Sequence, residues 1–110
     1  MIIYCGYYYF MKHGGIIIRD NLTQDCRGIL SRIGERPIIQ INKNDSLEEQ
    51  VITVLHEFVH IGIEYLGILY SCLPEIDPVI EQKVETKTQA FYQRNSPLAG
   101  KIREMLQGLR

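Results

Sequence analysis

A capped, amphipathic helical pattern in the middle of the chain constrains the fold more than any other feature. Ser46 is a preferred N-cap residue, and Glu49, three positions later, completes a capping box. Apolar residues then recur at helical spacing, namely Leu47, Val51, Leu55, Val59 and Ile63. These signals predict a helix over residues 47–66 that buries one of its faces.

Inside this helix lies an H-E-x-x-H motif formed by His56, Glu57 and His60. Histidines four residues apart project from one helix face, so their imidazoles can converge on one tetrahedral zinc ion. Zinc acidifies a water that it binds, and Glu57 is then placed to accept the proton and pass it to a leaving amine. The alternative interpretation is that both histidines are core residues and that the pattern arises by chance.

A zinc site of this kind needs a third protein ligand, for which the downstream carboxylates are the candidates. No histidine follows the motif, and His13 lies far upstream, where it is expected to be a surface residue. Asp77-Pro78 predicts the start of a second helix, over residues 78–94. Glu81 and Glu85 share one face of that helix. One of them is predicted to bind the metal, and the other can hold a histidine N–H.

The segments before the central helix predict a small sheet. Residues 2–10 and 16–20 are rich in Ile, Tyr or Phe and are expected to form strands. Residues 28–33 and 37–42 are expected to form a hairpin. We therefore predict a single α+β domain over residues 1–110, in which a small antiparallel or mixed sheet packs on the motif helix and on the helix that carries the third ligand.

The end of the chain predicts a short amphipathic helix after a break at Asn95-Ser96-Pro97. Its expected apolar stripe consists of Leu98, Ile102, Met105 and Leu109. This stripe can simply complete the core. Alternatively, the basic tail lies over the acidic middle of the chain and holds the protein latent, in which case removal of residues 97–110 should raise activity.

Composition limits the partners and the compartment. The net charge is −1, and Lys and Arg form no dense cluster, so no direct nucleic-acid contact is expected. The longest apolar stretch is shorter than the roughly 18 residues of a membrane-spanning helix, so no membrane contact is expected. Three cysteines without C-x-x-C spacing, and a start without signal-peptide features, predict a cytoplasmic protein. The sequence leaves a homodimer open.

Three stretches resemble the gluzincin metallopeptidases, and most of all the ImmA/IrrE type of small zinc peptidase domain. They are "GILSRIGERPIIQIN", "DSLEEQVITVLHEFVHIGI" and "ETKTQAFYQRNSPL". In the third stretch, Glu85, Thr88, Phe91-Tyr92 and Pro97 are similar in spacing to the family's third-ligand helix. This register makes Glu85 the third ligand. Glu81 followed by Glu85 instead resembles the E-x-x-x-D pattern of thermolysin-like enzymes, which makes Glu81 the alternative.

The resemblance implies a zinc-dependent endopeptidase whose protein or peptide substrate is a regulatory protein such as a transcriptional repressor. The strand at 37–42 is expected to be the sheet edge on which an extended substrate docks. The candidates for stabilising the reaction's oxyanion are Tyr65, Tyr70 and Tyr92. The competing hypothesis is a non-catalytic or latent zinc-binding regulatory module that binds a partner protein.

Overall fold

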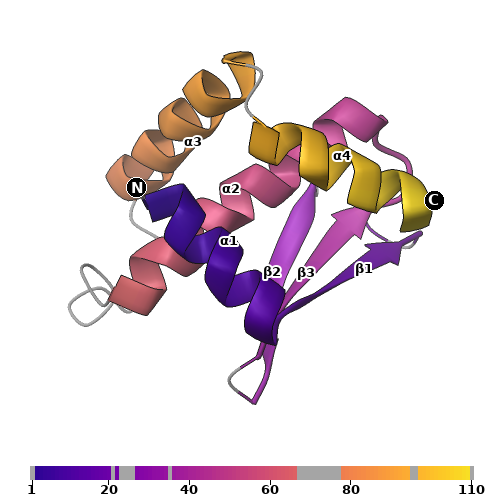
Figure 1. The fold of residues 1–110 in the computed structure, drawn as a ribbon, viewed down its shortest axis with the longest axis horizontal. Coiled ribbons are helices and arrows are strands. Elements are labelled where there is room, and N and C mark those ends of the chain that lie inside the picture. The colour runs from indigo at the N-terminus through magenta and orange to yellow at the C-terminus, as the bar shows by residue number, and fades with distance from the viewer. Residues whose placement is uncertain are drawn as a thin grey trace.

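The computed structural model describes residues 2–20, 22, 27–34, 36–66, 78–94 and 97–109. The elements follow the order α1 (Ile2–His13), β1 (Gly15–Arg19), β2 (Gly28–Ile33), β3 (Arg36–Asn42), α2 (Leu47–Leu66), α3 (Pro78–Gln93) and α4 (Pro97–Leu109). In Figure 1 the three strands lie side by side, and α2 runs diagonally between the sheet and α3. The predicted α+β class is confirmed.

The sheet is mixed, with the strand order β1-β3-β2. β1 pairs with β3 in parallel, and β2 pairs with β3 in the predicted antiparallel hairpin, whose turn places Gly34 at a φ of 65°. The prediction that the strand at 37–42 is a docking edge is wrong, because β3 is the central strand and both of its sides are paired. Within the described sheet, the unpaired edges belong to β1 and β2.

Helix α2 has the bounds that capping and periodicity predicted. Ser46 Oγ accepts a hydrogen bond from the backbone N–H of Glu49 at 3.2 Å, which is the N-cap contact. The Glu49 carboxylate contacts the guanidinium of Arg27. The predicted cap at Asp77 lies outside the described residues, but Pro78 is the first residue of α3, as expected.

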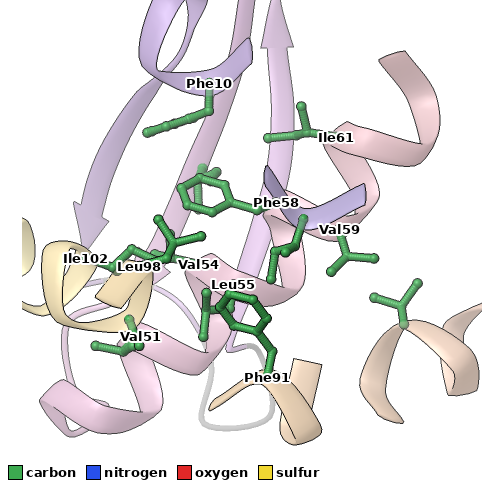
Figure 2. Packing of buried hydrophobic residues seen from close by; sticks show 14 of the residues in the cluster. Phe10, Val51, Val54, Leu55, Phe58, Val59, Ile61, Phe91, Leu98 and Ile102 are labelled. Atoms are coloured by element: carbon green, nitrogen blue, oxygen red, sulfur yellow. The ribbon is translucent and has the colours of Figure 1, made fainter. Parts of the chain in front are cut away.

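The core lies between α2, the inner face of β3 and the flanking helices. Val51, Leu55 and Phe58 of α2 are completely buried, as are Ile39 and Ile41, which alternate along β3. Figure 2 shows Leu55 close to Phe91 of α3, and Val51 close to Leu98 and Ile102 of α4. Because α2 contacts α1, α3, α4 and β3, its position is fixed from several sides.

The prediction of a strand over residues 2–10 is wrong, because this segment forms helix α1. The strand prediction followed the high β-propensity of Ile, Tyr and Phe, which tertiary packing overrides here. Ile3, Gly6 and Phe10 are buried, at the three- and four-residue spacing of a helix. The helical pattern was not visible in the sequence because Gly6 has no apolar side chain. Its contribution is that it lets the backbones of α1 and α2 approach each other closely.

Helix α4 contributes buried side chains to the core. This is the first of the two roles predicted for the tail, the other being a latent cover over the acidic middle of the chain. The buried residues of α4 are Leu98, Ala99, Ile102 and Leu106. The predicted stripe is wrong at its end, because the side chain of Leu109 is 50% exposed and Leu106 takes the buried position. Among the described helices, none has both the length and the apolar character needed to cross a membrane.

Candidate metal centre

His56 and His60 lie on one face of α2, and both are half-buried. Their Nε2 atoms are 3.2 Å apart, and their ring centroids are 5.0 Å apart with the ring planes at 50°. Leu55 and Val59, which precede them, are buried in the core and therefore fix the rotation of α2 about its axis. The two imidazoles thus converge at the edge of the core.

The separation of the two Nε2 atoms is a hydrogen-bond distance, with the donor set by the tautomers of the two rings, and it is also close to the spacing of two nitrogens on one metal ion. Two nitrogens that bind one tetrahedral zinc ion at 2.0–2.1 Å lie about 3.3–3.4 Å apart, close to the 3.2 Å observed. Neutral imidazole nitrogen is a preferred ligand of zinc. His56 and His60 therefore have both the donor chemistry and the spacing of a metal-binding pair.

The carboxylate of Glu85 lies on the other nitrogen of His56. Its Oε2 is 3.1 Å from His56 Nδ1, and its Oε1 accepts a hydrogen bond from Gln89 Nε2 at 3.2 Å. The side chain of His56 is 16% exposed and that of Glu85 is 54% exposed, so the contact lies at the surface end of the site. Because the carboxylate of Glu85 is an acceptor, we assign the proton of a neutral His56 ring to Nδ1. The lone pair on Nε2 of His56 is then directed toward His60.

A carboxylate on the Nδ1 of a metal-binding histidine orients the ring and raises its basicity. The structure thus brings Glu85 to the histidine pair, but on the nitrogen that orients His56 rather than between the two Nε2 atoms. Glu81 lies one turn earlier on α3, and its side chain is outside the described part of the chain. Among the described side chains, no group of three or more potential ligands is assembled.

Glu57, the predicted general base, is half-buried and follows His56 on α2. Successive helical residues are about 100° apart around the axis, so Glu57 lies beside the histidine face and not on it. His13 is exposed at the end of α1, where its ring contacts Tyr9 at a centroid distance of 4.8 Å. Of the oxyanion candidates, Tyr70 and the side chain of Tyr65 lie outside the described residues.

Tyr92, the third oxyanion candidate, belongs to a different cluster. Its hydroxyl donates to Glu48 Oε1 at 2.5 Å, and Arg103 donates to both oxygens of the same carboxylate at 2.7 Å. The hydrogen bonds from Arg103 and Tyr92 lower the pKa of Glu48 to about 2, and the bond to Glu48 raises the pKa of Tyr92. The sequence did not predict this cluster, because its three residues come from three different helices.

The lowered pKa of Glu48 makes part of the folding stability depend on pH. Because the folded pKa of about 2 is below the reference value of 4.5, the carboxylate stabilises the fold above about pH 4.5 and loses this effect as the pH falls toward 2. We expect Glu48→Gln to lower the free energy of unfolding at pH 6, and the difference from wild type to shrink between pH 4.5 and 2. Urea titrations at several pH values in this range measure the difference in the free energy of unfolding. A difference that does not change with pH would contradict the assignment.

Comparisons with protein-family models, with curated proteins and with solved structures find no match for this chain. The resemblance to small zinc peptidases therefore stays a prediction from three stretches of sequence. The described atoms themselves offer two converging imidazole nitrogens, a carboxylate on His56 and a second carboxylate, Glu57, next to it in sequence. Two imidazole nitrogens make part of a metal-binding set, and the described side chains do not complete it.

Proposed function

We propose that this chain is a zinc-dependent endopeptidase in which His56 and His60 bind the metal through Nε2. The observation that carries the proposal is the pair of Nε2 atoms 3.2 Å apart on a rigid, capped helix, with a carboxylate on the Nδ1 of one of them. Core histidines paired by chance would not require such a carboxylate. The arrangement combines ligand, spacing and orienting contact, which a metal site needs together.

In this proposal His56, Glu57 and His60 of α2 each have one task. His56 and His60 hold the ion, which supplies Lewis acidity toward the scissile carbonyl and toward water. Glu57 accepts the proton of the attacking water and passes it to the leaving amine, which is the role of a general base and then a general acid. A carboxylate of α3 completes the ligand set, and Glu85 contacts His56 Nδ1. The proposed substrate is a protein or peptide, and the family resemblance favours a transcriptional repressor.

The third ligand comes from α3, and two assignments remain. Glu85 is the first, because its carboxylate lies beside His56 in the described part of the chain and because the family register selects it. Glu81 is the second. Its support is that Glu85 already contacts His56 Nδ1, which would make Glu85 the orienting residue and the carboxylate one turn earlier the ligand. The two assignments predict different effects of single substitutions.

Elemental mass spectrometry of the purified protein tests the metal site and its third ligand. We expect close to one zinc per chain in the wild type and almost none in His60→Ala. If Glu85 is the ligand, Glu85→Gln loses the metal and Glu81→Gln keeps it. If Glu81 is the ligand, Glu81→Gln loses the metal, and Glu85→Gln weakens zinc affinity by about 10- to 100-fold, as the removal of an orienting partner does.

Two results would decide against the proposal. A wild-type protein that binds no zinc, even when zinc is supplied, would make His56 and His60 core residues and remove the basis for peptidase chemistry. A protein that binds zinc normally in His60→Ala would place the metal elsewhere. Glu104→Gln is a suitable control for the glutamate variants, because Glu104 is an exposed carboxylate on α4. It should bind zinc like the wild type.

A further inference from the structure

Among the described side chains, polar contacts join α2 and α3 at two points along the helix pair. One is His56 Nδ1 with Glu85 Oε2, and the other is Glu48 Oε1 with the hydroxyl of Tyr92. Glu48 precedes His56 by about 12 Å along α2, and Tyr92 follows Glu85 by about 10.5 Å along α3. Because the earlier residue of α2 contacts the later residue of α3, the two helices run antiparallel, and the nearly equal lengths are consistent with one shared register.

The contact at Glu48 is held more firmly than the contact at His56. Arg103 of α4 donates from Nε to Oε2 and from Nη2 to Oε1 of Glu48, both at 2.7 Å. Such a two-point pair fixes the plane of the carboxylate, and charge-assisted bonds are stronger than neutral ones. Tyr92 then donates to a carboxylate whose orientation is already set. The cluster thereby joins α2 to both α3 and α4, each of which packs against α2.

The described apolar contacts of α3 fix its register less sharply than directional polar contacts do. Among the described side chains of α3, Val84, Thr88 and Phe91 are buried, and the Thr88 hydroxyl donates within its own helix to the carbonyl of Val84. Hydrophobic burial is non-directional, so it allows small shifts along the helix axis. A shift by one residue moves a side chain by about 1.5 Å along the helix and about 100° around it. That shift would take Glu85 away from His56 Nδ1.

We propose that Glu48, Tyr92 and Arg103 form a clamp that positions α3 against α2, and thereby holds Glu85 beside His56. The proposal rests on the metal site proposed above and adds residues two helical turns away from it. These are positioning residues, because they act on the metal only through the placement of α3. The clamp also gives the C-terminal helix a part in the site, through Arg103.

Glu48 and Glu49 offer a matched pair of variants for the test. Both lie in the first turn of α2, and both carboxylates pair with an arginine, but Glu49 pairs with Arg27 of the segment before β2 and not with α3 or α4. Alanine at either position removes one negative charge and one ion pair from the same helix end. We expect Glu48→Ala and Tyr92→Phe to weaken zinc affinity by about 5- to 10-fold, and Glu49→Ala to change it by less than about twofold.

Zinc affinity is measured by competition with a chromophoric chelator, at a temperature where circular dichroism shows every variant folded. A role in stability alone would lower the unfolding midpoint of Glu48→Ala and leave zinc affinity at the wild-type value, and this would overturn the clamp. The double variant Glu48→Ala with Tyr92→Phe should bind zinc no more weakly than Glu48→Ala alone, because Glu48→Ala already removes the contact that Tyr92→Phe removes. Additive losses would also overturn it.

The same measurements separate failure of the clamp from failure of the metal site. A wild type that binds zinc through His60, with clamp variants that bind it equally well, overturns the clamp and keeps the proposed function. A wild type that binds no zinc overturns both. A loss of affinity in Glu49→Ala as large as that in Glu48→Ala would show a general effect of the first turn of α2, and would also overturn the clamp.

Discussion

Glu57→Gln is expected to abolish peptide cleavage while zinc stays bound. Glutamine keeps the shape of the side chain but cannot accept the proton of the attacking water, and loss of a general base typically costs about 10²- to 10⁴-fold in rate. Glu57 is half-buried, and the buried neighbours on its helix hold the helix in place. We therefore expect Glu57→Gln to keep the wild-type fold. Cleavage of a quenched-fluorescent peptide library, run beside elemental analysis for zinc, measures both quantities.

Three outcomes of this experiment have different meanings. Cleavage lost with zinc retained in Glu57→Gln, and both retained in Glu104→Gln, supports the catalytic role. Cleavage at the wild-type rate in Glu57→Gln contradicts that role. Zinc bound by a wild type that cleaves no peptide in the library favours the competing hypothesis of a zinc-binding regulatory module, for which Glu57 is dispensable.

The parts of the fold that local signals determine were predictable from sequence. The bounds of α2 follow from the Ser46 cap and from apolar residues at helical spacing. The hairpin follows from two apolar strands joined by a short loop with Gly34 at positive φ. In both cases the residues that carry the signal lie close together in the chain, and no distant contact competes with their preference.

The order of the strands was not predictable in the same way. β3 becomes central because β1 joins it in parallel, with Gly15 opposite Ile38, and nothing in either segment specifies a partner. A central strand and an edge strand that are both rich in β-branched residues have similar sequences, so the sequence does not distinguish them. The prediction of a docking edge at 37–42 failed for this reason.

The candidate site shows the same division. The convergence of His56 and His60 depends only on their spacing along one helix, so the sequence was enough. The contact of Glu85 with His56 Nδ1 depends on how α3 packs against α2, and the cluster of Glu48, Tyr92 and Arg103 depends on three helices. Sequence reasoning found Glu85 as a candidate through its position, but the nitrogen that it contacts follows from tertiary packing.

Gly6 lies where helix α1 approaches the backbone of α2 most closely among the described glycines. A Cβ atom at this position would lie 1.7 Å from the carbonyl oxygen of Phe58, 2.7 Å from its carbonyl carbon and 3.0 Å from the backbone nitrogen of Gly62. These are backbone atoms of α2, so no rotation of a side chain can relieve the contact. Helices α1 and α2 must therefore separate to accept any larger residue, and Phe10, whose ring lies 5.1 Å from that of Phe58, would move with α1.

Gly6→Ala is accordingly expected to destabilise the fold by about 2 kcal/mol or more, since overpacking against backbone outweighs the roughly 1 kcal/mol that alanine gains over glycine in a helix. Gly100→Ala is the matched control, because no atom lies within 4 Å of its added Cβ, and it should stabilise the fold by about 0.5–1 kcal/mol. Urea unfolding of the two variants beside wild type measures both. Equal stability of Gly6→Ala and Gly100→Ala would mean that α1 does not cross α2 at Gly6. Opposite signs are the result expected if position 6 lies against the backbone of α2 and position 100 faces open space.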